Sequence, residues 1–356
     1  MLGRAGRRKA RSSKLSDALP ALICIPARNE EAVLPDLLTG LAGLAGDWGR
    51  VTVCVLLDNC ADRSAALLEQ RAPHLPYRLI VGTRDQGGPP NAGVARHAAM
   101  TTALDLLGGN EALLFTTDAD TIPAPDWIVA GRRAAAVADA VAGRILRQGA
   151  RGDALQSRIE HYYDRLHRYR RALDPVAWEA RDTHHFSGGA NMAIRASTYR
   201  EMGGFKPLAS GEDATLLDDA ARDGFRVRRD AAMRVTTSSR RDGRATGGLA
   251  DDLRALEAGV PPRTADPRAA AWQWSAQAAA RRSFAVIDGV DERFALGERL
   301  GLTADHILGV ARDCPNAEAF AMRIVPGSPS YDASMTLAEA EEMLAMMELR
   351  TCGIAA

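Results

Sequence analysis

The sequence predicts an α/β fold in which a mainly parallel sheet is flanked by helices and followed by a helical C-terminal extension. Three observations predict it. Short apolar runs alternate with helix-like stretches between residues 18 and 116, as they do when crossover helices join parallel strands. Polar residues follow the ends of several apolar runs. From Pro261 onward the chain is rich in alanine and typical of helices.

The alternating elements can be assigned in order. Residues 19–25 form an apolar run that Pro26 stops, which predicts a buried strand, and apolar residues then recur at helical spacing over 32–45. Further strands are predicted at 51–57, 77–81, 112–116 and 138–146, and further helices at 64–71, 92–107 and 153–171. Ligands of such sheets bind beyond the carboxyl ends of the strands, so we expect the site there.

Composition and charge describe an ordinary globular protein. The chain has 356 residues with 45 basic and 45 acidic side chains, so its net charge gives no reason to expect a nucleic-acid partner. We expect a basic flexible tail over 1–17, a main domain over 18–260 and a helical extension over 261–356. The role of that extension is unknown: it is expected to be either an accessory helical domain or an element through which a homodimer forms.

The sequence also predicts a cytoplasmic location. It holds no apolar run of the roughly 18 to 20 residues that a membrane span needs, and its basic start lacks the apolar core of a signal peptide. The five cysteines show no metal-binding spacing, which agrees with a reducing compartment. The basic tail leaves peripheral association with the inner face of the membrane as an open alternative.

The clearest chemical signal is the pair Asp118 and Asp120, which follows a predicted buried strand. Two carboxylates one residue apart can meet one hard cation, and Mg²⁺ or Mn²⁺ is usually held by one or two carboxylates together with substrate phosphates. Such a metal would neutralise a departing diphosphate. The plain alternative is a solvated turn.

Two further signals lie later in the chain. Glu212 and Asp213 precede a helical run and are either N-terminal helix charges or a general base that takes a proton from a hydroxyl. Gly188 and Gly189 either let the backbone approach a ligand closely or form a tight turn before a strand.

Together the motifs resemble family 2 of the glycosyltransferases, which have the GT-A fold. Each motif is weak alone, but six occur in the family's order, and the likeness covers roughly residues 19–244. The motifs are IPARNEE at 25–31, DNCADRS at 58–64, GPPNAG at 88–93, TDAD at 117–120, GGAN at 188–191 and GED at 211–213.

The resemblance implies roles for individual residues. Those beside the nucleotide sugar would be Pro26, Arg28, Glu30, Asp58, Asn91, Gly93 and Asp118. Asp120, with Asp118 beside it, would bind the metal. Gly188, Gly189 and Asn191 would shape the acceptor side, and Asp213, next to Glu212, would be the catalytic base. The implied reaction moves a sugar, with inversion and Mg²⁺ or Mn²⁺, from a nucleotide-diphosphate sugar to a hydroxyl of a small molecule or lipid head group.

The sequence departs from the family pattern in three places. Asn59 and Cys60 stand where many members carry a second acid and then glycine. The Gln-x-x-Arg-Trp motif of processive synthases is absent, which favours a non-processive enzyme. No third metal ligand is obvious, and residues 237–244 occupy its expected place. Guanidinium groups match phosphate well, so the basic residues there are either diphosphate contacts or a solvated loop: Arg240, Arg241 and Arg244.

Three alternatives stay open. The first is a retaining transferase of the same fold that makes a small glycosylated metabolite, such as a sugar glycerate. The second is a nucleotidyltransferase, which would carry a glycine-rich, basic loop where residues 26–31 stand. The third is a non-catalytic protein that binds a nucleotide sugar.

Overall fold

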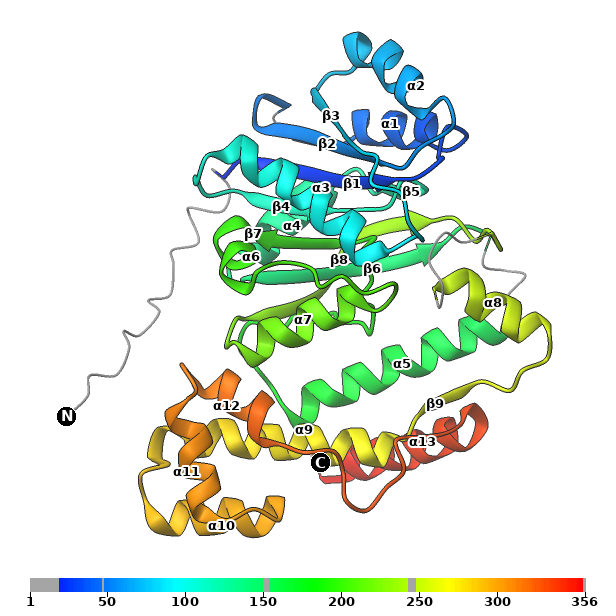
Figure 1. Ribbon diagram of the computed structural model, residues 1–356. Helices are drawn as coiled ribbons and strands as arrows, with labels where there is room; N and C mark the ends of the chain where they lie inside the picture. Colours follow the sequence, from blue (N-terminus) through cyan, green and yellow to red (C-terminus); the bar gives the residue numbers. More distant parts are fainter. Residues whose placement is uncertain (1–18, 47, 150–153, 243–247, 355–356) are drawn as a thin grey trace.

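The computed structural model describes residues 19–46, 48–149, 154–242 and 248–354, so the basic tail predicted over 1–17 lies outside the described residues. An eight-stranded sheet in the order β3-β2-β1-β4-β7-β6-β8-β5 forms its centre (Figure 1). Strands β1 to β4, β6 and β8 run in one direction, while β7 and β5 run in the other. The strands are β1 (Ala21–Ala27), β2 (Val51–Asp58), β3 (Arg78–Arg84), β4 (Leu113–Thr116), β5 (Thr121–Pro123), β6 (Ala140–Arg147), β7 (Met192–Arg195) and β8 (Val227–Thr237).

Helices cover both faces of this sheet, which confirms the predicted α/β class. One apolar core joins one face to α1 (Leu34–Ala42), α2 (Ser64–Arg71) and α4 (Trp127–Ala135). A second core joins the other face to α3 (Ala92–Leu107), α6 (Ala196–Met202) and α7 (Glu212–Arg222). Side chains alternate between the faces of a strand, and successive residues of β1 accordingly enter the two cores in turn.

The first strand, β1, contains a proline near its carboxyl end, where the site is expected. β1 continues past the expected end at Pro26 to Ala27. The carbonyl of Cys24 accepts a hydrogen bond from the N–H of Thr117 at 3.4 Å, so this side of β1 faces β4. Backbone groups two residues apart face the same side of a strand, and position 26 therefore also faces β4. Proline has no N–H, but pairing with β4 already ends at Cys24, so Pro26 costs the sheet no hydrogen bond.

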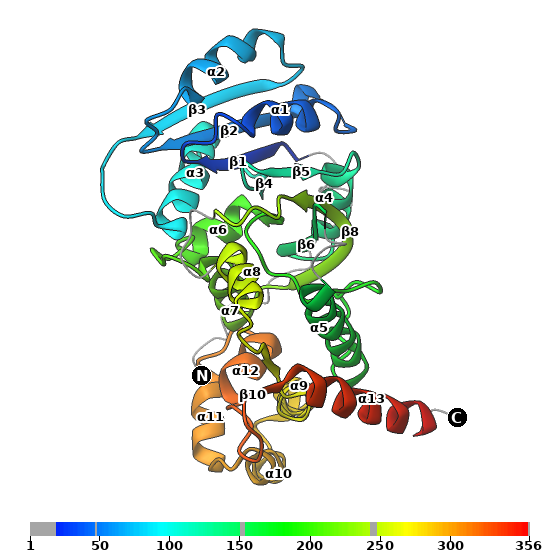
Figure 2. The same cartoon turned by 90° about the vertical axis from the view of Figure 1, so that its right-hand side faces the viewer.

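The predicted helical extension is present. After α8 (Leu249–Glu257), a two-stranded sheet of β9 (Arg263–Ala265) and β10 (Ser334–Thr336) accompanies the C-terminal helices. These helices are α9 (Pro267–Ser283), α10 (Val290–Leu300), α11 (Ala304–Arg312), α12 (Ala317–Ile324) and α13 (Leu337–Ile354). Helices α9 to α12 bury a third apolar core around Phe320, on the opposite side of α5 (Ala154–Leu173) from the main sheet (Figure 2).

Two sets of contacts tie these helices to the rest of the chain. The apolar stripe of α5 packs on α13 and α9 through Tyr162 and Leu166. Helix α12 meets the end of α7, where Asn316 Nδ2 donates to the carbonyl of Gly224 at 2.8 Å and Arg323 Nη2 lies 2.9 Å from Asp223. In the part of the chain that the structure describes, no helix is both long and apolar enough to cross a bilayer.

Candidate active site

A pocket of about 490 Å³ lies beyond the carboxyl ends of β1, β2 and β4, where the sequence places the site. Its lining comes from the ends of β1, β2 and β8, from the segments after β1, β4 and β8, and from Ile145 of β6. The Gly-Gly loop and the starts of α3, α7 and α8 also contribute. Of the residues predicted from the sequence, twelve line this pocket: Pro26, Arg28, Glu30, Asp58, Asn91, Asp118, Asp120, Gly188, Gly189, Glu212, Asp213 and Arg240.

One end of the pocket lies at the carboxyl ends of β1 and β2. Asp58, at the end of β2, is buried and lies 2.5 Å from Arg84 Nη1, while its Oδ1 accepts from Asn59 Nδ2 at 2.8 Å. Arg28 Nη1 is 4.0 Å from the other carboxylate oxygen. Asn59 takes a left-handed backbone with φ 51°, which asparagine tolerates better than most residues. Asn59, which departs from the family pattern, therefore allows the backbone to turn after Asp58 and also donates a hydrogen bond to its carboxylate.

Asp118 and Asp120 follow β4 and differ in their surroundings. Asp120 is largely buried, and its Oδ2 accepts from Ser238 Oγ at 2.9 Å and lies 3.1 Å from Arg240 Nε. Burial raises the pKa of Asp120, Asp118 raises it further, and Arg240 only partly offsets them. The carboxylate of Asp118 is about one third exposed to the pocket.

These two carboxylates fit a divalent cation as far as the protein's own ligands go. Among the described residues, no group of three or more His, Cys, Asp or Glu side chains is placed to hold a metal. Mg²⁺ usually takes only one or two carboxylates and completes its shell with water and substrate phosphates, so two acids at a pocket wall suffice if a diphosphate binds beside them. In the free protein Asp120 is already paired with Arg240, so a cation would have to compete with this guanidinium for the carboxylate.

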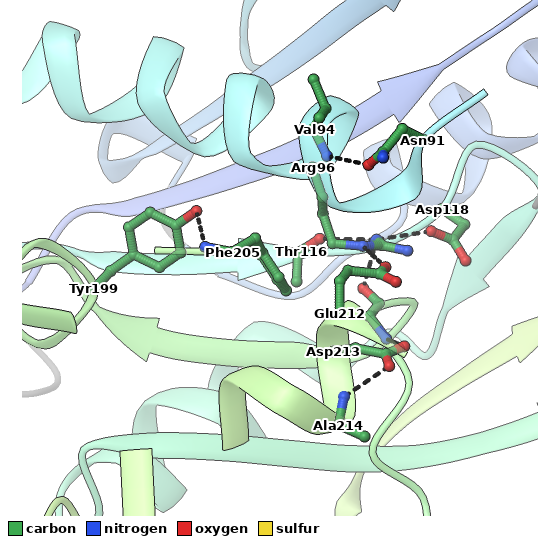
Figure 3. Close-up of polar contacts among 11 residues, drawn as sticks. Asn91, Val94, Arg96, Thr116, Asp118, Tyr199, Phe205, Glu212, Asp213 and Ala214 are labelled. Atoms are coloured by element: carbon green, nitrogen blue, oxygen red, sulfur yellow. Dashed lines mark hydrogen bonds and ion pairs between the residues drawn. The ribbon is translucent and has the colours of Figure 1, made fainter. Parts of the chain in front are cut away.

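The residue at the centre of the site is Arg96, which was not among the residues predicted from the sequence. Its guanidinium lies 2.9 Å from Asp118 Oδ1 and 3.1 Å from Glu212 Oε1, between the two pocket walls (Figure 3). It also donates to the carbonyl of Gly189 at 3.0 Å and to Thr116 Oγ1 at 3.3 Å. Burial lowers the pKa of Arg96, but the carboxylates raise it by more, so the guanidinium stays charged.

A signal for Arg96 was present in the sequence. The buried face of α3 is formed by small and apolar residues, and Arg96 stands one turn before Met100 on that face. A charge on an apolar helix face needs a buried partner. Its presence also explains a glycine, because a Cβ on Gly189 would lie 2.4 Å from the guanidinium carbon.

The two acids at the start of α7 point to different partners. Glu212 is buried against Arg96; burial raises its pKa, and Arg96 only partly offsets this. Asp213 accepts from the N–H of Gly189 at 2.8 Å through Oδ2 and from the N–H of Ala214 at 2.7 Å through Oδ1, and it faces the pocket. The backbone thus fixes the orientation of the Asp213 carboxylate.

Four of the predicted residues are not found in the lining. Asn191 is fully buried, where its amide donates to the carbonyls of Arg144 and Met233 and accepts from Trp127. Gly93 donates its N–H to Leu208, and a Cβ there would lie 2.0 Å from the Lys206 carbonyl oxygen, so this glycine permits a close backbone approach behind the pocket. Arg241 pairs with Glu257 of α8. Arg244 lies outside the described residues.

Residues 20–247 match the family described as Glycosyltransferase like family 2. The chain belongs to this family. The resemblance drawn from the six motifs is thereby confirmed, and the matched region contains the whole eight-stranded sheet and the predicted site residues.

Individual relatives of this family 2 protein are distant. It is 26% identical over 209 residues to the probable glycosyltransferase YdaM of Bacillus subtilis (strain 168), which is 58% of this chain and 47% of YdaM, so the match spans about half of that relative. Its fold is similar to that of S. aureus TarS 1–349, solved in complex with UDP-GlcNAc, with a TM-score of 0.50 and 14% identity over 85% of this chain and 90% of that one. The similarity to the TarS structure confirms the GT-A type of sheet.

Proposed function

We propose that this family 2 protein transfers a sugar from a nucleotide-diphosphate sugar to a hydroxyl of an acceptor, with inversion and without processive synthesis. The observation that carries the proposal is the two-walled pocket. One wall presents Asp58, Asp118 and Asp120 at strand ends, and the other presents Asp213, whose carboxylate is oriented by backbone N–H groups. A donor and an acceptor that meet between these walls would have their reacting atoms beside a base.

The donor would lie along the wall formed by the ends of β1, β2 and β4. Asp58 and Arg28 stand at the end suited to a base and ribose, and hydrogen bonds to such polar edges give a nucleotide its orientation. Arg240 faces the same wall and would contact the diphosphate, since a guanidinium pairs with two phosphate oxygens at once. When bound, Mg²⁺ or Mn²⁺ would supply positive charge to the leaving diphosphate.

Asp213 would act as the catalytic base. The acceptor hydroxyl gives its proton to an Asp213 oxygen as the new bond to the anomeric carbon forms and the bond from that carbon to the diphosphate oxygen breaks. Glu212 is less suited to this step, because its carboxylate is buried and paired with Arg96. A single displacement of this kind inverts the anomeric carbon, so product stereochemistry separates it from the retaining alternative.

The proposal is tested by binding and by turnover in the same preparation. The thermal stability of the full chain is measured with uridine, guanosine and other nucleoside diphosphates and their sugars, with and without Mn²⁺. We expect one nucleotide to raise Tm in a Mn²⁺-dependent way, by up to about 2.7 kcal/mol of stability at a hundredfold excess over Kd. Asp120→Ala should lose the Mn²⁺-dependent part. Release of nucleoside diphosphate with candidate acceptors measures turnover, and a chain that binds none of these donors would contradict the proposal.

The acceptor class, the cytoplasmic location and a homodimer through the C-terminal helices stay predictions. Light scattering on the purified chain measures the oligomeric state, and fractionation of cells measures association with the membrane.

A further inference from the structure

Arg240 bridges two acids that the proposed donor site needs. Its Nη1 and Nη2 lie 2.7 Å from the two carboxylate oxygens of Glu30, and its Nε lies 3.1 Å from Asp120 Oδ2. Parallel bonds to both oxygens of one carboxylate are the strongest geometry that a guanidinium offers. Glu30 is buried, whereas the Arg240 side chain is about one third exposed and faces the pocket.

The backbone holds this arginine in place. Thr237 ends β8, and its hydroxyl hydrogen-bonds to that of Thr121 at 2.9 Å across the β5–β8 pair. One residue later the N–H of Ser238 donates to the carbonyl of Asp120 at 3.2 Å. The segment that carries Arg240 is therefore bonded to the segment that carries Asp120, which keeps the guanidinium within reach of this carboxylate.

Asp120 is consequently engaged before any ligand arrives. Its Oδ2 contacts both Ser238 and Arg240, and its Oδ1 lies 3.4 Å from the hydroxyl of Thr121. A divalent cation at this carboxylate would stand within a few ångströms of a guanidinium of like charge, where repulsion is strong in a partly buried site. A diphosphate would remove that repulsion, because it offers Arg240 a new anionic partner and adds ligands to the metal.

We propose that Arg240 acts as an internal counter-ion that makes binding of the divalent cation depend on the nucleotide. In the free protein Arg240 pairs with Asp120. The metal and the diphosphate bind together, and Arg240 then moves from Asp120 to the phosphates. This inference rests on the proposed function, and it concerns the order of binding and the residue that sets it.

The test measures Mn²⁺ binding directly, by electron paramagnetic resonance of free Mn²⁺ and by calorimetry, with the metal alone and with UDP or GDP added. Wild type should bind Mn²⁺ weakly alone and tightly with the matching nucleotide. Arg240→Gln should bind Mn²⁺ alone at least about tenfold more tightly than wild type, since the repelling charge is gone. Arg240→Lys keeps a charge and should stay weak.

Two controls define the result. Arg234→Gln removes a positive charge from a half-exposed position on β8, the strand that precedes Arg240, and should behave as wild type. Asp120→Asn should abolish Mn²⁺ binding in the Arg240→Gln background. Equal binding of Mn²⁺ alone by wild type and Arg240→Gln would overturn the inference and leave the transferase proposal standing. Absence of Mn²⁺ binding in every arm would overturn it together with the metal dependence, while turnover without metal would still support the transferase.

Discussion

Replacing Arg96 with methionine is the sharpest test of how the site is held together. The substitution keeps a long unbranched side chain on α3 but removes the charge that stands between Asp118 and Glu212. Arg96 is only 7% exposed and Glu212 only 3%, so solvent cannot replace the lost partner of Glu212. Asp118 is about one third exposed, so the loss of its ion pair with Arg96 should change the free energy of unfolding little.

The magnitude follows from that burial. Breaking a buried ion pair by removing one partner typically costs about 3 to 5 kcal/mol, because an uncompensated charge is left behind. For a chain of this size the loss would lower Tm by on the order of 10 °C. Adding Glu212→Gln to Arg96→Met removes the stranded charge and should recover part of the loss, which a merely steric effect of methionine would not allow.

The stability difference should also depend on pH. Burial already raises the pKa of Glu212 in the folded wild type, and loss of Arg96 removes what offsets it. A raised folded pKa means that the group contributes stability below its unfolded pKa and loses it as pH rises through the folded value. Denaturant unfolding of Arg96→Met and wild type from about pH 5 to about pH 8 should show a gap that widens with pH. A gap below about 1 kcal/mol at the upper end, or one that pH does not change, would refute this account of Arg96.

Three other substitutions test separate parts of the chain. Asp213→Asn should lower kcat by about 100- to 10,000-fold while donor binding, measured by calorimetry, stays near wild type; an unchanged kcat would remove Asp213 from the role of base. Gly93→Ala should destabilise the fold by about 1 to 3 kcal/mol, because its Cβ would meet the Lys206 carbonyl at 2.0 Å. Gly309→Ala, in helix α11 with open space around it, should instead stabilise the fold by roughly 0.5 to 1 kcal/mol. Thermal unfolding measures both glycine variants, and equal effects on Tm would contradict the packing argument.

Where local chemistry determines an element, the sequence was enough to predict it. The bounds of α3 match the prediction because Asn91 caps its start, accepting from the N–H of Val94, and Gly108 ends it in a left-handed conformation. Helix α2 also has the predicted limits. The strand-end acids meet in one pocket because parallel strands bring their carboxyl ends to the same edge.

Elements that depend on distant partners escaped prediction. Strand β8 is rich in arginine, and only the alternate burial of Ala231, Met233 and Val235 marks it as a strand. Asn191 follows the Gly-Gly loop and was expected at the acceptor, yet its amide satisfies buried carbonyls from β6 and β8. Such partners lie more than 40 residues away along the chain, so no local pattern names them.

The contact between α12 and α7 connects the C-terminal helices to the helix that carries the proposed base. Helix α7 carries the proposed base in its first turn, and Asn316 and Arg323 contact Gly224 and Asp223 directly after its last turn. A substitution in α12 that removes these contacts would therefore act on the helix that carries Asp213 without altering a pocket residue. A protein engineer who transplanted only residues 20–247 into another member would lose the part of the pocket wall that the start of α8 forms, and would leave the helix of the proposed base without this support.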